Sequence, residues 1–193
     1  MTDPLPALTR EQGTALLDIA RRAIRDRVTG HRSEWFLLHN AALQVPAGVF
    51  VTITRDRDLR GCIGYVDPIK PLDEAVAYCA ASAATADPRF PPVTGDDLPH
   101  LRVEVSVLSP LQTIPDPEAI RVGTHGVFIS QAARHGLLLP QVATEFGWDR
   151  ETFLRQTCLK AGLPGDAWKH GAAIQIFTVD HFTDDVPVGS KES

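Results

Sequence analysis

The chain has 193 residues, a net charge of −5 and 44% hydrophobic residues, enough for one sizeable core or two small lobes. No apolar run approaches the ~20 residues of a membrane span, and the N-terminus lacks the basic-then-apolar pattern of a signal peptide. The acidic balance makes nucleic acid an unfavourable partner, and three widely spaced cysteines without a CxxC pair indicate reduced thiols in a cytoplasmic protein.

The first half of the chain carries two helix patterns. Apolar residues recur at helical spacing over residues 11–28, and Thr9 precedes them as a candidate N-cap. Residues 72–86 form an alanine-rich helical pattern that starts after Pro71, a residue suited to the first turn of a helix. Because alanine side chains are small, we expect this second helix to lie close against a sheet. Residues 31–45 fit either a short helix or a loop.

Three strands are predicted in the same half. Residues 48–54 and 59–65 alternate as half-buried strands, and the polar tetrad at residues 55–58 suits a hairpin loop between them. Residues 101–108 alternate over a full strand length, so we expect their odd positions to be buried and their even positions to share the other face.

The second half predicts shorter elements. In chain order these are a hairpin over residues 120–130 with its turn at 124–126, a turn and short strand at 134–140, helices at 141–146 and 150–161, and a strand at 173–179. Hairpins and helices without regular βαβ alternation predict an α+β fold with a mixed or antiparallel sheet flanked by helices. We expect one domain over residues 8–186, with flexible tails at 1–7 and 187–193.

The first candidate site centres on Cys62. Gly61 and Gly64 bracket it, Arg60 precedes it, and glycine inside a strand pattern marks a close backbone approach. Cys62 is a candidate nucleophile if an arginine or exposed amide groups stabilise its thiolate. The alternative, which we favour, is a buried strand cysteine whose neighbouring glycines admit another backbone.

The second candidate is a proline-rich loop with an acid, a base and an aromatic ring, Asp87, Arg89 and Phe90. Arg89 is suited to bind a carboxylate or phosphate with two parallel hydrogen bonds. Equally, Asp87 and Arg89 can pair with each other, or with Glu104, and fix the loop.

Glu104, Ser106 and His125 complete the candidate residues. Glu104 and Ser106 share one face of a predicted strand and become site residues if that face borders a cleft. Glu104 is a candidate general base, with a solvated or arginine-paired strand glutamate as the alternative. His125 fits a metal ligand, a base or, as we favour, an ordinary turn residue, and His135 and His170 are other candidate bases. The sequence predicts no metal site and no cofactor, and it contains no P-loop, GxGxxG, HExxH or GxSxG string.

Six ordered strings together resemble one family, the AmmeMemoRadiSam system protein A family, which includes the AMME-syndrome candidate gene product. They lie at residues 48–52, 59–64, 87–90, 104–109, 136–143 and 160–164. The resemblance covers nearly the whole chain and implies a compact α+β protein of two sub-lobes with a cleft between them. It also implies two partners, a Memo-like protein similar to extradiol dioxygenases and a radical S-adenosylmethionine protein, and no settled reaction.

Two functional hypotheses follow. In the first, which we favour narrowly, the protein is a binding or adaptor component that acts with those two partners. In the second it is an enzyme whose cleft uses Cys62 as a reactive thiol, with Glu104 and His125 as further catalytic residues. In both, the substrate-binding candidates are Arg60, Gly61, Gly64, Asp87, Arg89, Phe90 and Ser106.

Overall fold

The structure is a computed structural model that describes residues 7–31 and 41–184. The chain divides into two compact units: unit 1 spans Met1–Leu108 and Asp180–Ser193, and unit 2 spans Ser109–Val179. Each unit combines helices with a four-stranded sheet, so the predicted α+β class is confirmed. No helix in the described part of the chain has the length and apolar composition that a membrane crossing needs.

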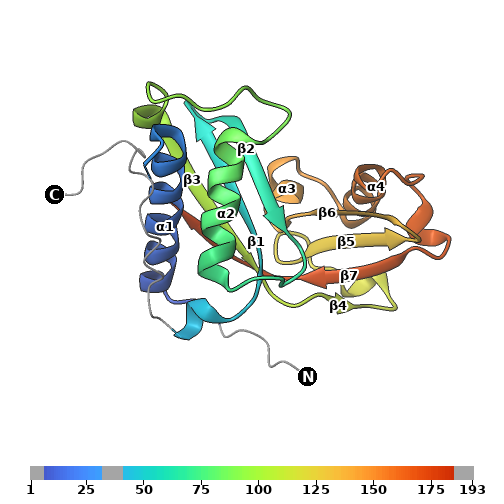
Figure 1. The fold of residues 1–193 in the computed structure, drawn as a ribbon. Helices are drawn as coiled ribbons and strands as arrows, with labels where there is room; N and C mark the ends of the chain where they lie inside the picture. The colour runs from blue at the N-terminus through green and yellow to red at the C-terminus, as the bar shows by residue number, and fades with distance from the viewer. Residues whose placement is uncertain (1–6, 32–40, 185–193) are drawn as a thin grey trace. The chain divides into compact units, whose positions relative to one another are not determined.

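Unit 1 places two helices side by side across one face of a sheet with strand order β2-β1-β3-β8 (Figure 1). Antiparallel pairs join β1 to β2 and β1 to β3. The helices and strands are α1 (Arg10–Thr29), β1 (Gly48–Arg55), β2 (Asp58–Tyr65), α2 (Leu72–Thr85), β3 (Leu101–Leu108) and β8 (Val179–Thr183), with short 3₁₀ helices at Ala41–Gln44 and Leu98–His100.

Helix α1 begins and ends at the signals in its sequence. The Thr9 hydroxyl accepts the N–H of Gln12 and the Gln12 side chain accepts the N–H of Thr9, which together form a capping box. Gly30 follows the helix with a φ of 75°, a left-handed conformation that glycine adopts at little cost. The predicted helix and its predicted cap are therefore confirmed.

The β1–β2 hairpin turns at Asp56 and Arg57, whose φ angles are 52° and 76°. Two consecutive positive φ angles are what a two-residue type I′ turn requires. Beyond the turn, the two strands pair in register up to Val49 and Tyr65, with one irregularity near Ile53. The predicted strand pair and its polar loop are confirmed.

Helix α2 approaches β2 at Gly61. A Cβ atom at this position would lie 2.1 Å from the carbonyl oxygen of Ala83, so no side chain fits between the helix backbone and the strand. Ala80, Ala83 and Ala84 of α2 are buried. The expectation that an alanine-rich helix lies close against a sheet is therefore correct, and one of the bracketing glycines is explained by it.

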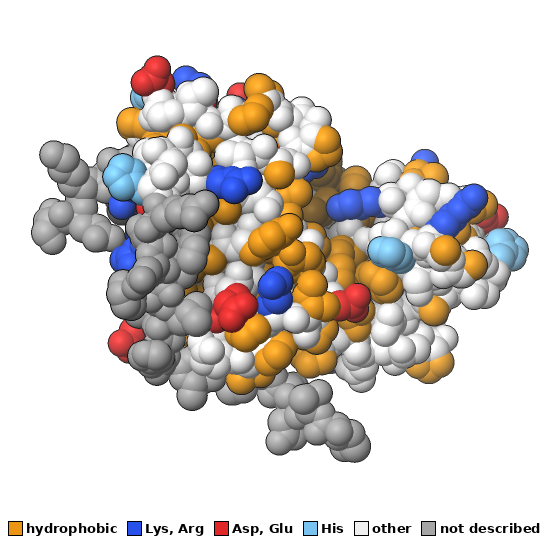
Figure 2. Space-filling model, viewed as in Figure 1, with side chains coloured by type: hydrophobic (Ala, Val, Ile, Leu, Met, Phe, Trp, Pro, Cys, Tyr) orange, Lys and Arg blue, Asp and Glu red, His pale blue; other side chains and the backbone are white. Residues whose placement is uncertain are grey.

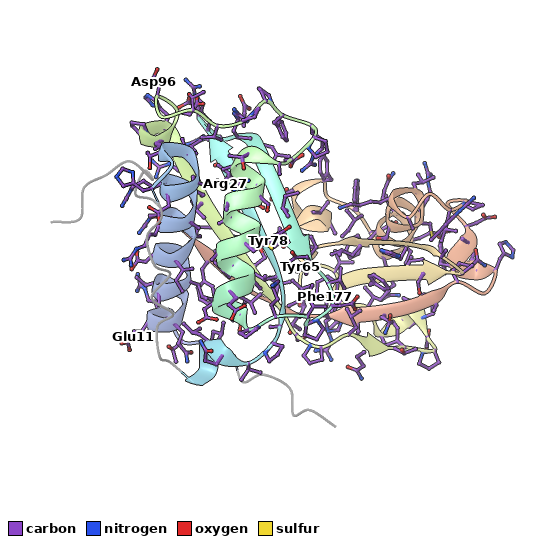
Figure 3. The ribbon with its side chains drawn as sticks, viewed as in Figure 1. Glu11, Arg27, Tyr65, Tyr78, Asp96 and Phe177 are labelled. Atoms are coloured by element: carbon purple, nitrogen blue, oxygen red, sulfur yellow. The ribbon has the colours of Figure 1, made fainter. Side chains whose placement is uncertain are left out.

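Apolar side chains also reach the surface of unit 1 near α2. Val45, Ile69 and Tyr78 are exposed large apolar residues, and apolar side chains gather over α2 in the space-filling view (Figure 2). Tyr78 stacks on Tyr65 with 5.7 Å between ring centroids, and the two lie next to each other in Figure 3. Desolvation, followed by the hydrogen bond with Tyr78, raises the pKa of Tyr65 to about 12, so this phenol stays protonated at neutral pH.

Unit 2 has its own sheet, with strand order β4-β7-β5-β6, and its own apolar core. All three strand pairings are antiparallel. Phe153 and Leu154 of α4 pack with Val127 and Ile129 of β5 in this core. The elements are β4 (Gln112–Thr113), β5 (Gly126–Gln131), β6 (Arg134–Leu138), α3 (Pro140–Glu145), α4 (Arg150–Lys160) and β7 (Ala173–Phe177), with 3₁₀ helices at Pro117–Ala119 and Ala167–Lys169.

One prediction of secondary structure is wrong, one predicted strand is confirmed with an earlier end, and one prediction is only partly described. The hairpin predicted at residues 120–130 is absent, because the Thr124 and His125 N–H groups both bond the Arg121 carbonyl and close a turn there. The hairpin is formed instead by β5 and β6. The strand predicted at 173–179 ends at Phe177, and β8 follows it. Of residues 31–45, those at 32–40 lie outside the described residues.

We expect Gly61→Ala to destabilise unit 1, because the added methyl group meets the Ala83 carbonyl backbone rather than a movable side chain. Overpacking of this kind costs about 2 kcal/mol or more in free energy of unfolding, measurable by urea denaturation. Gly95→Ala is the control, since nothing lies within 4 Å of its added Cβ. Equal stability of the two variants would contradict the close approach of α2.

Candidate functional site

The candidate site lies on the face of the unit 1 sheet that turns away from α1 and α2, which we call the distal face. Val49, Val51 and Ile53 of β1 are buried in the core that contains the helices. Since side chains alternate along a strand, Phe50 and Thr52 point to the distal face. The strand register then decides which residues join them.

A row of polar side chains crosses this face. Thr52 pairs in register with Cys62 of β2 on one side and with Glu104 of β3 on the other. On β8, the His181 Nδ1 atom lies 3.7 Å from Glu104 Oε1 and 3.2 Å from the buried Ser106 hydroxyl. We call Cys62, Thr52, Glu104, Ser106 and His181 the distal row; four strands contribute to it.

Cys62 is the accessible thiol of the chain. It is half-buried, whereas Cys79 and Cys158 are buried, and the Thr52 hydroxyl donates a hydrogen bond to its Sγ atom at 3.3 Å. Burial, with a smaller contribution from the nearby Cys62, raises the pKa of Cys79 to about 12. Cys79 is thus an inert core residue, and Cys62 is the thiol available for chemistry.

The main chain of Cys62 is held by Asp87 and Arg89. The Asp87 carboxylate accepts the Cys62 N–H at 2.9 Å, and the Arg89 guanidinium donates to the Cys62 carbonyl at 3.2 Å. Arg89 also donates two side-chain hydrogen bonds to Asp87, at 2.9 and 2.7 Å. The two side chains therefore satisfy an edge-strand residue as a neighbouring strand would. We call this arrangement the edge clamp.

The edge clamp is an electrostatic unit. The Asp87 side chain is buried, and the hydrogen bonds from the Arg89 side chain, supported by the Cys62 and Arg89 N–H groups, hold its pKa well below its usual range. Arg89 also lies over the Phe90 ring, 5.4 Å from its centroid. These contacts match the interpretation that Asp87 and Arg89 pair and fix the loop.

Arg60 fixes the far end of the same loop. Its guanidinium donates to the Pro91 carbonyl at 2.6 Å and to the Pro92 carbonyl at 3.2 Å. It also lies 3.9 Å from the carboxylate of Asp97, which accepts hydrogen bonds from Thr94 and Arg55. The bonds that the structure describes for Arg60 therefore go to the loop that follows α2.

Gly64 permits a second close approach. An added Cβ would lie 2.3 Å from the Phe50 ring and 2.4 Å from the Val49 carbonyl oxygen. Gly64 and Gly61 are thus both required by internal packing, the first on the distal face and the second on the helix face. A role for either glycine in substrate binding stays a prediction.

The predicted bases belong to a different unit from the distal row. His125, His135 and His170 all lie in unit 2. The His125 Nδ1 atom accepts the N–H of Arg121 at 3.2 Å, which closes the local turn. The histidine of the distal row is His181, which the sequence analysis did not single out.

β8 carries His181 into place because three contacts fasten it to the rest of unit 1. The Leu8 N–H donates to the Asp180 carboxylate at 2.8 Å, and the Phe182 ring fills the space beside Gly13 of α1. Arg21 of α1 binds the buried carboxylate of Asp184 with two guanidinium nitrogens. The signal that could have identified His181 is Phe182, an apolar residue between two polar ones.

Unit 2 contains a hollow of about 310 Å³ lined partly by Arg150, Glu151 and Trp168. Its charges are largely paired, because Arg150 binds Glu118 and Lys169 binds Glu151. The distal row is the stronger candidate, since it gathers a thiol, a carboxylate and an imidazole. Within residues 7–31 and 41–184, no three His, Cys, Asp or Glu side chains group as metal ligands.

Comparison with known proteins gives consistent matches over most of the chain. The AMMECR1 family profile matches residues 17–182. A protein of Methanothermobacter thermautotrophicus is 45% identical over 177 residues, covering 83% of this chain and 88% of its own length. The crystal structure of uncharacterized protein PH0010 from Pyrococcus horikoshii is similar with a TM-score of 0.89 and 41% identity, covering 96% of this chain and 97% of that one.

We expect Asp87→Asn to lower the free energy of unfolding at pH 7 by about 2 kcal/mol, because the buried pair with Arg89 loses its charge. The lowered pKa of Asp87 means that its ionised form stabilises the fold above about pH 4 and that this contribution is lost as the pH falls further. The gap between wild type and variant should therefore narrow below pH 4 in urea titrations.

The control for this experiment is Asp58→Asn, which changes an exposed carboxylate of β2, the strand that the edge clamp holds. Its stability should differ little from that of the wild type at either pH. A constant gap between wild type and Asp87→Asn from pH 7 to pH 3 would contradict the electrostatic role of the edge clamp.

Proposed function

The chain belongs to the AMMECR1 family, and from that premise we propose that it is a binding component acting with a Memo-like protein and a radical S-adenosylmethionine protein. The observation that carries the proposal is the distal row, in which four strands present polar side chains on one sheet face. The two partners come from the resemblance to the AmmeMemoRadiSam system. The three free thiols suit the cytoplasm, the compartment that we propose.

Two features favour binding over independent catalysis. The group that hydrogen-bonds Cys62 Sγ is the Thr52 hydroxyl, which donates to sulfur and is a poor general base. The charged pair beside Cys62 is engaged in the edge clamp, so the side-chain hydrogen bonds described for Arg89 go to the Asp87 carboxylate and the Cys62 carbonyl rather than to a bound anion. Both arrangements suit a preformed surface that recognises a partner or a ligand.

The proposal predicts that the purified protein binds a purified Memo-like protein, or the Memo-like and radical S-adenosylmethionine proteins together, as measured by surface plasmon resonance. Thr52→Val and Glu104→Gln should each weaken that binding by roughly tenfold, the size of a moderate interface contact. Asp96→Asn, an exposed change in a loop of unit 1 (Figure 3), should leave the affinity unchanged.

Thermal unfolding of each variant separates lost binding from lost folding. The proposal would be overturned if the protein failed to associate with either partner, alone or combined. Unchanged affinity in both distal-row variants would instead remove the distal row from it.

The second candidate function is an enzyme that uses Cys62 as a reactive thiol to modify a small molecule or a macromolecule. The specific observation in its favour is that Cys62 is half-buried, with its sulfur oriented by Thr52. The substrate-binding residues proposed for this function are Arg60, Gly61, Gly64, Asp87, Arg89, Phe90 and Ser106. The catalytic roles of Glu104 and of His125, which lies in unit 2, stay predictions from the sequence.

Cysteine alkylation measures whether that thiol is available. We expect iodoacetamide to label Cys62 in the native protein at least tenfold faster than Cys79 or Cys158, since both of these are buried and burial raises both pKa values. Mass spectrometry of one sample reports all three sites, so the buried thiols serve as internal controls. Labelling of Cys62 only after denaturation would remove the thiol enzyme from consideration.

A further inference from the structure

His181 contributes the imidazole ring of the distal row, and the ring is held through one of its two nitrogens. Its Nδ1 atom lies 3.2 Å from the Ser106 hydroxyl and 3.7 Å from Glu104 Oε1. Ser106 is 1% exposed, whereas the side chains of His181 and Glu104 are 38% and 29% exposed. The ring is therefore held at Nδ1 by a buried hydroxyl, while more than a third of the His181 side chain stays exposed.

The two neighbours of Nδ1 decide which nitrogen carries the proton. The Glu104 carboxylate only accepts hydrogen bonds, so an Nδ1 lone pair facing it would be repelled. The Ser106 hydroxyl can accept a hydrogen bond from Nδ1–H and thus fits the same tautomer. With the proton on Nδ1, the neutral ring has its lone pair on Nε2. In the part of the chain that the structure describes, the contacts of the ring are those at Nδ1.

This geometry differs from a serine nucleophile assembly. In a Ser-His-Asp triad the hydroxyl and the carboxylate bind opposite nitrogens, so that one orients the ring while the other loses its proton. Here both lie at Nδ1, and the hydroxyl is buried. Ser106 and Glu104 are consequently positioning residues, and the reactive atom of the group is Nε2 of His181.

We propose that His181 is the proton acceptor of a ligand site on the distal face, and that the ligand offers a neutral O–H or N–H group. The ligand donates a hydrogen bond to Nε2. In full transfer the O–H or N–H bond of the ligand breaks, its electron pair stays on the ligand oxygen or nitrogen, and a new N–H bond forms at Nε2. The carboxylate of Glu104, 3.7 Å from the ring, disfavours an anionic ligand.

The inference rests on the proposed function only in taking the same face as the binding surface. It deepens that function by naming the chemistry of the ligand group and the atom that receives it. The protein can fail to bind its partners while His181 still accepts a hydrogen bond at Nε2, and the reverse is equally possible. The experiment therefore measures the protonation of the His181 ring directly.

Long-range ¹H–¹⁵N NMR of the full-length labelled protein distinguishes the two neutral tautomers. His181→Gln identifies the signals of this ring by their disappearance. We expect neutral His181 to carry its proton on Nδ1, and the double variant Glu104→Gln with Ser106→Ala to shift the ring toward the Nε2–H form. Thr54→Val, a change on the neighbouring strand β1, is the matched control and should leave the tautomer unchanged. An Nε2–H ring in the wild type would overturn the proposal.

Phenol and benzoate then test the ligand class, because the first offers a neutral O–H and the second is an anion without a donor. Phenol should shift the His181 Nε2 signal in a saturable way, and benzoate should not. The phenol effect should be at least fivefold weaker in the double variant, whose folding is checked by its thermal unfolding. A larger response to benzoate, or no response of Nε2 to either probe, would overturn the ligand site.

Discussion

The edge clamp is the interaction on which the geometry of unit 1 depends. It satisfies both main-chain groups of Cys62 with side chains from one loop, at the edge of the sheet. A slip of β2 by one residue would break these bonds and exchange its two faces, because side chains alternate along a strand. It would also move Gly61 away from the Ala83 carbonyl, where no other residue fits. The edge clamp at Cys62 and the close approach of α2 at Gly61 thus both fix the register of β2.

That register produces the distal row. Because the N–H and C=O of Cys62 point outward to the clamp, Cys62 and Thr52 form a pair without mutual main-chain hydrogen bonds, in which side chains approach most closely. The 3.3 Å contact between the Thr52 hydroxyl and the thiol follows from this. Thr52 then uses its own main-chain groups toward β3, where Glu104 is its partner. One ion pair in a loop therefore positions a thiol and a carboxylate on separate strands.

Local patterns in the sequence predict much of unit 1. The alternation of apolar and polar residues identifies β1, β2 and β3 and puts Glu104 and Ser106 on one strand face. Gly61 and Gly64, on either side of Cys62, correctly indicate a close backbone approach. His181 was missed because β8 follows β7 after a single residue, without the glycine or proline that normally marks a strand boundary. Its contact with Ser106 joins residues 75 positions apart, and only the strand order brings them together.

The strand order also favours ligand or partner recognition over catalysis by a paired nucleophile and base. Neighbouring strands lie about 4.8 Å apart, so Cys62 and Glu104, on strands two apart, are separated by about 10 Å along the sheet, and Cys62 and His181 by about 14 Å. A nucleophile and its base need to approach within hydrogen-bond distance, which Thr52 and β1 prevent here. An extended ligand or a protein surface contacts both ends of such a row at once. The thiol and the imidazole are therefore better understood as two recognition points on one face than as two halves of one catalytic pair.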